Sequence, residues 1–560
     1  MINRGRSCQP RAVRSTFGVV PKWHSRRKKC PKSLERTNPD CVACNVVPVQ
    51  IREVGNLVEG YRNWDSWRSS LYFGCVLGAI AIFYSATVRP GHLWADDFAM
   101  YVHHAQNIVE GRPYAETGYI YNPRVPAYSP GMYPPVFPLL LAPSYQLFGL
   151  NLLPMKLEQV AFFLLALAAA YLLWRRDVGS RYALALIAIL GFSPVFWSAK
   201  DSVLSDLPFL FFFYLAALIA QLAPRNGKRW WAWAVILGLT VYTALGTRAA
   251  GIALIPGLLL YDTLRQRKVT RFTAIAVMIS VVLAVLQNYF IGSAPGGYVQ
   301  QAHAITMHTI LFNLAEYSRV LAGFWIASVR NVFSFVVLAI VTLLTLAGVL
   351  YRYKRGISII EALLVPYLGI LLLWPYAAGV RAVFPVIPWI VFLALTGLRG
   401  FSERFVRNYA WAATWGFLLL LAISFAERYR VIDFGPIREN QGLPEFNQLC
   451  ETVRNQSAPE DVFVYFRARA LALYTGRAAS TYNHRGTETD LEQDLQKIHA
   501  AYLITTSAFD EDGGFLRRYV QNHSEKFDLK YQNAKFNMYR IRTPRDAASA
   551  SSPHSEMPGN

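Results

Sequence analysis

Residues 69–101 read SSLYFGCVLGAIAIFYSATVRPGHLWADDFAMY. Residues 69–88 carry no charge, and about 20 consecutive apolar residues are long enough to cross a bilayer as one helix. The run ends at Arg89, and a pair of acids, Asp96 and Asp97, follows shortly after it. The stretch therefore predicts a membrane-spanning helix that leads into a polar, acid-bearing loop.

Blocks of the same kind recur along the chain and give about eleven candidate spans. They lie at 69–88, 157–174, 182–198, 205–223, 230–247, 249–263, 272–290, 331–351, 359–377, 382–398 and 408–426. Charged residues make up 16% of the 560 residues, whereas a soluble globular domain has about 25%. We therefore expect a mostly α-helical, polytopic membrane protein, and the collagen-like, disordered and small disulfide-rich classes are excluded.

Lys and Arg gather in alternate short loops, and such loops stay in the cytoplasm. The net charge of +21 lies in these loops and in the tails, so it does not indicate nucleic-acid binding. With eleven spans the N-terminus is cytoplasmic and the C-terminus is outside. Large outer loops are then expected at about 89–156 and 291–330, and a bacterial inner (plasma) membrane is the expected location.

Composition divides the chain into four parts, which are a basic cytoplasmic tail (1–64), a membrane domain (65–426), an outer domain (427–545) and a disordered end (546–560). Cys30, Cys41 and Cys44 in the basic tail lack standard zinc-ligand spacing. The outer domain is predicted to be α/β. Its strands are expected at 462–466 and 502–506, its helices at 468–474, 490–499 and 515–522, and a hairpin at 526–531 with 536–541. We expect this domain to dock substrate or to act as a cap.

The acid pair opens a short amphipathic helix in the first outer loop. Ala105 and Ile108 share a helical face with Tyr101, which places Asp96 and Asp97 at the helix N-terminus. Free N–H groups favour a carboxylate there, so helix capping alone would explain both acids. The proline-broken run 133–149 that follows suits a helix lying at the membrane surface.

Four motifs in this order resemble the GT-C superfamily of membrane glycosyltransferases, most closely its protein O-mannosyltransferase and aminoarabinose transferase branch. The first motif combines the acid pair with Tyr101, Ala105, Gly111, Tyr114 and Tyr133-Pro134-Pro135; the others are Asp206-Leu-Pro208, Thr247-Arg248 through Pro256, and Arg381-x-x-x-Pro385-x-x-Pro388. The resemblance covers about 65–426. All four motifs lie on the face that loop charge independently predicts to be outside.

The resemblance implies an enzyme that transfers a hexosyl or pentosyl group from a polyprenyl-phosphate donor, with inversion, to a protein, lipid or glycan acceptor outside the membrane. Asp97 best matches the family's catalytic acid, as a general base for an acceptor hydroxyl, and Asp96 is second. Asp206 would position the acceptor or the base. The stretch 133–151 lacks the Lys that aminoarabinose transferases carry near their Pro-Pro segment. This argues against assigning the substrate preference of those enzymes to this chain.

Departure of a polyprenyl phosphate requires positive charge near the developing oxyanion. Arg248 and Arg381 are the candidates, because each ends an uncharged run and a guanidinium can contact phosphate in a bidentate manner. Snorkelling to headgroups is the structural alternative for both. Lys200 is a weaker candidate, and Tyr101, His104 and Tyr133 are expected to support the site.

No group of residues has convincing metal-ligand spacing, so no metal site is predicted and no particular cofactor is indicated. A divalent cation held by two acids remains an alternative.

Three other functions compete with a transferase. A lipid-linked-sugar flippase would place charges near mid-span and repeat its broken helices. A polysaccharide polymerase or ligase would centre on a basic late outer loop. A non-catalytic relative would bind the lipid-linked sugar without transferring it.

Overall fold

The computed structural model describes residues 67–94, 96–126, 131–225, 227–292, 306–326, 332–353, 356–376, 379–405 and 409–542. The expectations for the basic tail, for Cys30, Cys41 and Cys44, and for the end of the chain from residue 543 lie outside the described residues.

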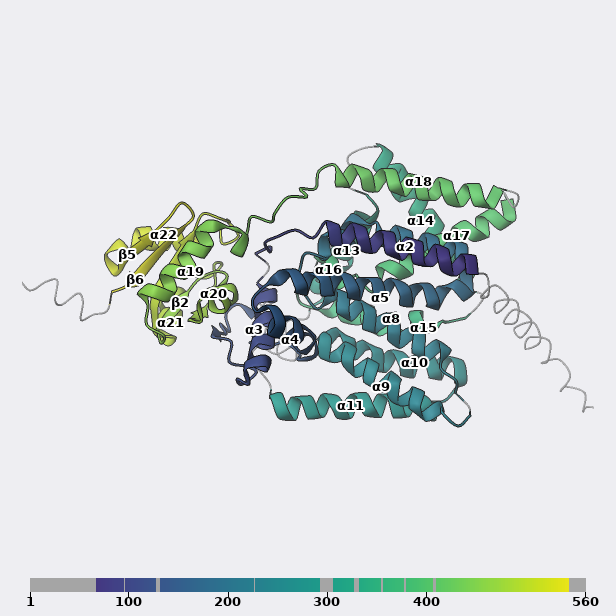
Figure 1. Ribbon diagram of the computed structural model, residues 1–560, viewed down its shortest axis with the longest axis horizontal. Helices are drawn as coiled ribbons and strands as arrows, with labels where there is room; N and C mark the ends of the chain where they lie inside the picture. The colour runs from purple at the N-terminus through teal and green to yellow at the C-terminus, as the bar shows by residue number, and fades with distance from the viewer. Residues whose placement is uncertain are drawn as a thin grey trace, which may run out of the picture. The chain divides into compact units, whose positions relative to one another are not determined.

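Every predicted span coincides with helical structure, and Figure 1 shows the long helices side by side. The elements are α2 (Trp67–Ala86), α5 (Leu152–Val178), α6 (Ser180–Gly191), α7 (Pro194–Ala199), α8 (Asp206–Leu222), α9 (Trp230–Thr247), η2 (Ala249–Ala253), α10 (Leu254–Gln266), α11 (Arg271–Ile291), α14 (Val332–Tyr353), α15 (Ile359–Leu373), α16 (Gly379–Ala382), α17 (Ile387–Phe405) and α18 (Ala410–Tyr429).

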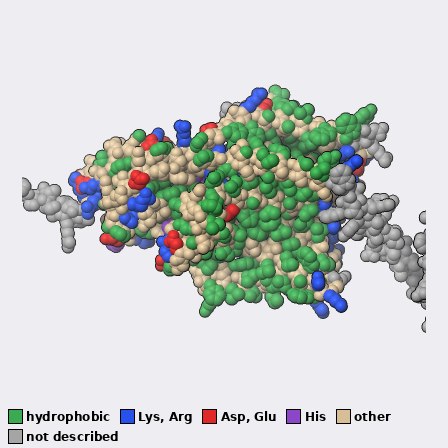
Figure 2. Space-filling model, in the orientation of Figure 1, with side chains coloured by type: hydrophobic (Ala, Val, Ile, Leu, Met, Phe, Trp, Pro, Cys, Tyr) green, Lys and Arg blue, Asp and Glu red, His purple; other side chains and the backbone are tan. Residues whose placement is uncertain are grey.

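Among the described residues, five of these helices are long and apolar enough to cross a membrane: α2, α5, α9, α11 and α14. Shorter apolar helices include α6, α8 and α15. Large apolar side chains on the bundle surface, such as Tyr289 and Phe290 of α11, are 80% and 77% exposed, and Figure 2 shows hydrophobic side chains gathered over the helices. Apolar surface of this extent suits lipid rather than water, as expected for a multi-pass membrane protein.

Prolines and local caps shorten two of the predicted spans. The segment 182–198 forms two helices, because α6 ends at Gly191 and Ser193 starts α7 by accepting a hydrogen bond from the Val195 N–H at 3.2 Å. The segment 382–398 begins its long helix only at Ile387, after the short α16; Pro385 precedes that start and has no N–H to donate. The loop at 291–330 contains a further helix, α13 (Met307–Trp325).

The first outer loop has the expected short helices, α3 (Asp97–Glu110) and α4 (Val136–Phe148). Helix α3 ends at Gly111, whose φ of 66° is the left-handed conformation that glycine adopts without strain. Between the two helices the loop forms a short strand, β1 (Tyr119–Ile120), which no periodicity predicted.

The C-terminal segment has the predicted α/β elements at nearly the predicted positions. They are η5 (Asn440–Gly442), α19 (Pro444–Gln456), β2 (Val462–Val464), α20 (Ala468–Thr475), β3 (Ala478–Ser480), α21 (Glu488–Lys497), β4 (Ala500–Thr506), α22 (Phe515–Asn522), η6 (Ser524–Lys526), β5 (Phe527–Gln532) and β6 (Phe536–Ile541). Helix α19 and strand β3 were not predicted.

One sheet joins the first outer loop to the C-terminal segment. Its strand order is β1-β3-β2-β4-β6-β5, parallel from β1 to β4 and antiparallel from β4 to β5. Tyr119 pairs with Ala479, and Ser480 Oγ donates to the Ile120 carbonyl at 2.9 Å. Trp94 and Phe98 of the loop share a buried apolar cluster with Phe446 of α19. The loop and the C-terminal segment are therefore built around a common core.

Candidate active site

Two acids and three arginines from five parts of the chain meet in one network, here called the acid–arginine cluster: Asp97, Asp206, Arg248, Arg381 and Arg469. Arg381 bridges the two acids, with Nη1 3.2 Å from Asp97 Oδ2 and Nε 2.8 Å from Asp206 Oδ2. Arg248 Nη1 donates to Asp206 Oδ1. Arg469 Nη1 donates to Asp97 Oδ1 at 3.3 Å.

Helix ends place these side chains. Asp97 and Asp206 are the first residues of α3 and α8, where free N–H groups favour carboxylates. Arg248 is extended at the end of α9, and the chain then turns directly into η2. Gly251 permits this turn, because a Cβ there would lie 2.6 Å from the backbone carbon of Ala244. Arg381 lies on the short α16.

Asp97 is strongly held in its ionised form. Burial raises the pKa of its carboxyl. The charges of Arg381 and Arg469 and the hydrogen bond from Tyr133 have the larger, opposite effect, and together they bring the pKa down to about 2. The carboxylate is therefore charged throughout the physiological pH range. Its side chain is still 30% exposed, so it remains accessible to a ligand.

The three predicted supporting residues contact one another and reach Asp97 through Tyr133. Tyr133 donates its hydroxyl to Asp97 Oδ1 at 2.8 Å and stacks on Tyr101 with ring centroids 4.5 Å apart. The Tyr101 hydroxyl lies 2.9 Å from Ser205 Oγ, next to Asp206. His104 is buried, its Nε2 accepting the Tyr133 N–H at 3.3 Å and its Nδ1 lying 2.7 Å from the Tyr114 carbonyl. Burial lowers the pKa of His104 to about 3, so a neutral imidazole orients Tyr133.

Asp96 caps a helix other than its own. It makes no side-chain capping bond to α3. Its Oδ2 and Oδ1 instead accept the backbone N–H groups of Arg469 and Ala470, at 3.1 and 2.9 Å, in the first turn of α20. Burial raises the pKa of Asp96 despite these bonds. The neighbouring acids therefore have different partners, Asp96 the backbone of α20 and Asp97 the arginine side chains.

The structure does not bring Lys200 to the acid–arginine cluster. Its side chain is fully buried, with Nζ 2.9 Å from Asp201 Oδ2 and 3.8 Å from the centroid of the Trp197 ring. Asp201 Oδ2 also accepts from Arg89 Nε at 2.8 Å. The neighbouring Asp201 offers a buried counter-charge, and this explains why Lys200 turns inward.

This second network predicts a large effect on stability. Replacing Asp201 by Asn leaves the buried Lys200 and the adjoining Arg89 without their counter-charge, which costs about 3–5 kcal/mol in free energy of unfolding. Thermal unfolding of the detergent-solubilised protein measures the loss. Glu403→Gln is the control, because this half-exposed partner of Arg399 contributes at most about 0.5 kcal/mol. Equal melting temperatures for the two variants would contradict the prediction.

Sequence reasoning missed Arg469. The residue lies in the predicted helix 468–474, but no motif includes it, and its contact with Asp97 spans 372 residues. A single Arg in the apolar sequence of α20, ARALALYT, was the one local signal.

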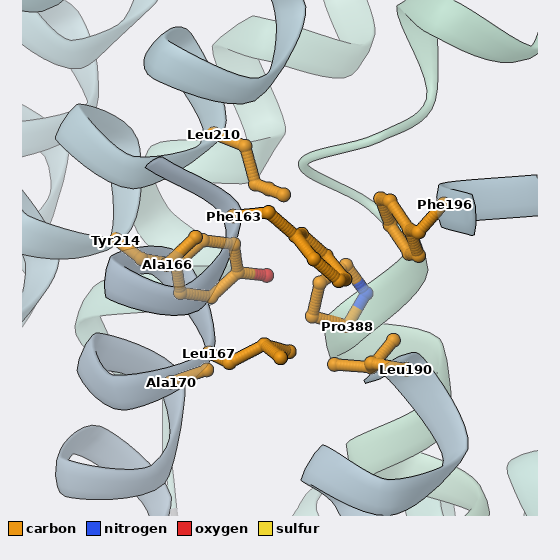
Figure 3. Close-up of a pocket in the computed structure, with 9 residues that line it drawn as sticks. All are labelled: Phe163, Ala166, Leu167, Ala170, Leu190, Phe196, Leu210, Tyr214 and Pro388. Atoms are coloured by element: carbon orange, nitrogen blue, oxygen red, sulfur yellow. The ribbon is translucent and has the colours of Figure 1, made fainter. Parts of the chain in front are cut away.

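An apolar pocket lies within the helix bundle (Figure 3). Its lining comes from α5, α6, α7, α8 and α17, and consists of Phe163, Ala166, Leu167, Ala170, Leu190, Phe196, Leu210, Tyr214 and Pro388. Leu210 and Tyr214 follow Asp206 by about one and two turns of α8, or roughly 6 and 12 Å along its axis. A continuous helix thus connects the acid–arginine cluster to an apolar interior.

Guanidinium groups outnumber carboxylates in the acid–arginine cluster. Three guanidinium groups face two carboxylates, so the formal charge of the ion-paired side chains is +1. In the part of the chain that the structure describes, no three His, Cys, Asp or Glu side chains are grouped so that they could hold a metal. Arginines in this arrangement can bind phosphate in a bidentate manner.

The sequence matches one family model, that of dolichyl-phosphate-mannose-protein mannosyltransferases, over residues 132–290. No curated protein sequence matches it significantly. The fold is similar to ArnT from Cupriavidus metallidurans bound to undecaprenyl phosphate, at 14% identity and a TM-score of 0.51, covering 87% of this chain and 99% of that one.

Two structures of an oligosaccharyltransferase from Archaeoglobus fulgidus are also similar. The first, in complex with Zn and sulfate, has 12% identity and a TM-score of 0.53, covering 83% of this chain and 72% of that one. The second, AglB with an inhibitory peptide and a dolichol-phosphate, has 14% identity and a TM-score of 0.52, covering 88% and 76%. The resemblance read from the sequence is confirmed, and the chain has the fold of the GT-C membrane glycosyltransferases.

Proposed function

We propose that the protein is a membrane glycosyltransferase that moves a sugar from a polyprenyl-phosphate donor to an acceptor outside the membrane. The main support is the acid–arginine cluster, which combines an accessible carboxylate, Asp97, with an excess of guanidinium charge. A transferase of this kind needs both, because one group activates the acceptor while the other stabilises the departing phosphate.

The proposed topology has eleven spans, a cytoplasmic N-terminus and a bacterial inner-membrane location. The charge asymmetry of the short loops supports this orientation. Residues 1–64 then form a cytoplasmic tail, and residues 427–545 form an outer α/β domain that shares its sheet with the first outer loop. This topology places the acid–arginine cluster on the outer face.

Arg381 and Arg248 are the proposed ligands of the donor phosphate. Both are partly exposed, at 31% and 20% of their side chains, and both are held in place by Asp206. As the bond between the sugar and the phosphate breaks, negative charge develops on the leaving oxygen. Guanidinium groups fixed beside it stabilise that charge without having to reorganise.

Asp97 is the proposed general base. With a pKa of about 2 it is a weak base in the unliganded site, because Arg381 and Arg469 stabilise its ionised form. A donor phosphate competes for Arg381, and weaker attraction from that arginine moves the pKa of Asp97 upward. Donor binding thus strengthens the base that removes the proton from an attacking hydroxyl. A single displacement of this kind inverts the anomeric centre.

The solved relatives support the class of donor. ArnT was solved with undecaprenyl phosphate, and AglB with a dolichol-phosphate and a peptide. Both lipids are polyprenyl phosphates. A protein, lipid or glycan can be the acceptor. We include no divalent cation, because the net positive charge of the acid–arginine cluster would repel it.

Mass spectrometry of glycans, glycoproteins and glycolipids after deletion of the gene tests the proposal. We expect one glycosylated product to disappear and its polyprenyl-phosphate sugar to accumulate, and the wild-type gene to restore both. Deletion membranes should transfer no label from that lipid-linked sugar, and added polyprenyl phosphate should inhibit wild-type membranes. An unchanged set of glycosylated products would contradict the proposal.

A further inference from the structure

Arg469 brings the C-terminal segment into the acid–arginine cluster. Its side chain is only 3% exposed. Nη1 lies 3.3 Å from Asp97 Oδ1 and 3.4 Å from the Tyr133 hydroxyl, and the guanidinium carbon lies 4.6 Å from the centroid of the Tyr119 ring. Arg469 is thus enclosed by the acid and by two tyrosines of the first outer loop.

Two consecutive acids fix this one residue. Asp96 accepts the backbone N–H of Arg469, whereas Asp97 accepts its guanidinium N–H. Asp96 also accepts the Ala470 N–H, so both of its oxygens are bound to the N-terminus of α20. A carboxylate at a helix N-terminus is favourable, and here it connects α20 to the start of α3.

The backbone around the contact restricts Arg469 further. Strand β1 follows α3 and pairs with β3, which follows α20, so the two helices that carry Asp97 and Arg469 also lead into neighbouring strands. Pairing of β1 with β3 therefore keeps the backbone of Arg469 close to the start of α3.

We propose that Arg469 is a positioning residue, which holds the Asp97 carboxylate in its reactive orientation and makes the C-terminal segment part of the active site. This inference rests on the proposed function. Arg469 is too buried to receive the donor itself, so it acts through Asp97, while Arg381 and Arg248 remain for the phosphate.

The pH dependence of transfer distinguishes this role from a structural one. Among the residues that the structure describes, the charged or titratable groups facing Asp97 include Arg381 of α16, Arg469 of α20, Tyr133 before α4, Asp96 beside it, and Asp206 of α8 through Arg381. Loss of one nearby opposite charge raises an acid's pKa by about 1–3 units. Transfer falls at low pH, on the acid limb of the pH–rate profile, when Asp97 becomes protonated. The low pKa of Asp97 keeps this limb at low pH. Loss of Arg469 raises the pKa, so the acid limb moves to higher pH.

The test compares Arg469→Gln, Arg469→Lys and wild type in membranes, from pH 4 to pH 8, with labelled lipid-linked sugar. We expect Arg469→Gln to lower kcat by about 10²-fold, the usual effect of a misplaced reacting group, and to move the acid limb upward by about one unit or more. Arg469→Lys keeps the charge, so it should restore the limb and part of the rate. Arg477→Gln is the matched control, since the side chain of Arg477 donates to Ser457 and to the Arg454 carbonyl and is not part of the acid–arginine cluster.

A wild-type rate and pH profile for a folded Arg469→Gln variant would overturn the inference, while loss of transfer in Asp97→Asn would leave the proposed function intact. Absence of transfer by the wild-type protein would instead remove the proposed function. If Arg469→Gln does not fold, Asp96→Asn is the second variant, because it weakens the contact with α20 and keeps Arg469. Because Asp96→Asn also removes a like charge beside Asp97, which moves the pKa of Asp97 the other way, its readout is kcat: it should lower kcat by less than Arg469→Gln, and a wild-type kcat would again overturn the inference.

Discussion

Asp97→Asn is expected to lower sugar transfer by about 10²–10⁴-fold, the contribution of a positioned general base. The amide keeps the size of the carboxylate but cannot take a proton from the acceptor. It also loses its charge-assisted bonds to Arg381 and Arg469. Transfer of labelled sugar by membranes with equal amounts of each protein measures the effect.

Glu110→Gln is the control for this variant, because Glu110 lies at the other end of α3, half-exposed and paired with Arg112. It should keep wild-type transfer. A non-catalytic binder would continue to work with Asn at position 97. Full transfer by Asp97→Asn, alone and together with Asp96→Asn, would contradict a catalytic role for the acid pair.

Arg381→Gln is expected to lower kcat/KM for the donor by about 10²–10³-fold, as removal of one oxyanion-stabilising donor does. The variant loses both the bridge between Asp97 and Asp206 and the charge proposed to face the phosphate. Arg381→Lys should recover only a small part of the lost kcat/KM, because an ammonium lacks the planar fork that contacts two carboxylates at once. Initial rates against donor concentration separate binding from turnover.

Arg399→Gln is the matched arginine control. Arg399 lies on α17, contacts Glu403 and the Asp177 carbonyl, and has no part in the acid–arginine cluster. Its transfer rate should stay within about twofold of wild type, a change of less than 0.5 kcal/mol. If Arg381→Gln keeps the same donor dependence as Arg399→Gln, the guanidinium of Arg381 does not bind the phosphate.

The parts of the fold set by local patterns were predictable. Apolar blocks predict the helices, and the alternation of loop charge predicts that Asp97, Asp206, Arg248 and Arg381 lie on one face. The structure brings these four together, Arg381 directly against Asp97 and Arg248 through Asp206. The order of the motifs along the chain was sufficient to predict that these residues meet. Each motif lies at the end of a helix, and the order of membrane crossings determines on which face that end lies.

Features that depend on distant parts of the chain could not be predicted. Arg469 meets Asp97 across 372 residues, and nothing beside Asp96 in the sequence shows that its partner is the backbone of α20. Strand β1 has only two residues, too few to show alternation. The sequence makes Lys200 a weaker candidate ligand of the phosphate, but packing against Trp197 and Asp201 buries it. Tertiary packing decided each of these.

Strand β1 limits how the protein can be recombined with its relatives. A chimera that exchanges only the residues after α18 would pair a foreign β3 with the native Tyr119 and Ile120, and would set a foreign helix against Asp96. The boundary between native and foreign residues would then cut through both the sheet and the contact of Asp96 with the helix N-terminus. Residues 89–126 and 430–542 should therefore be exchanged together, as one unit, and not the C-terminal portion alone.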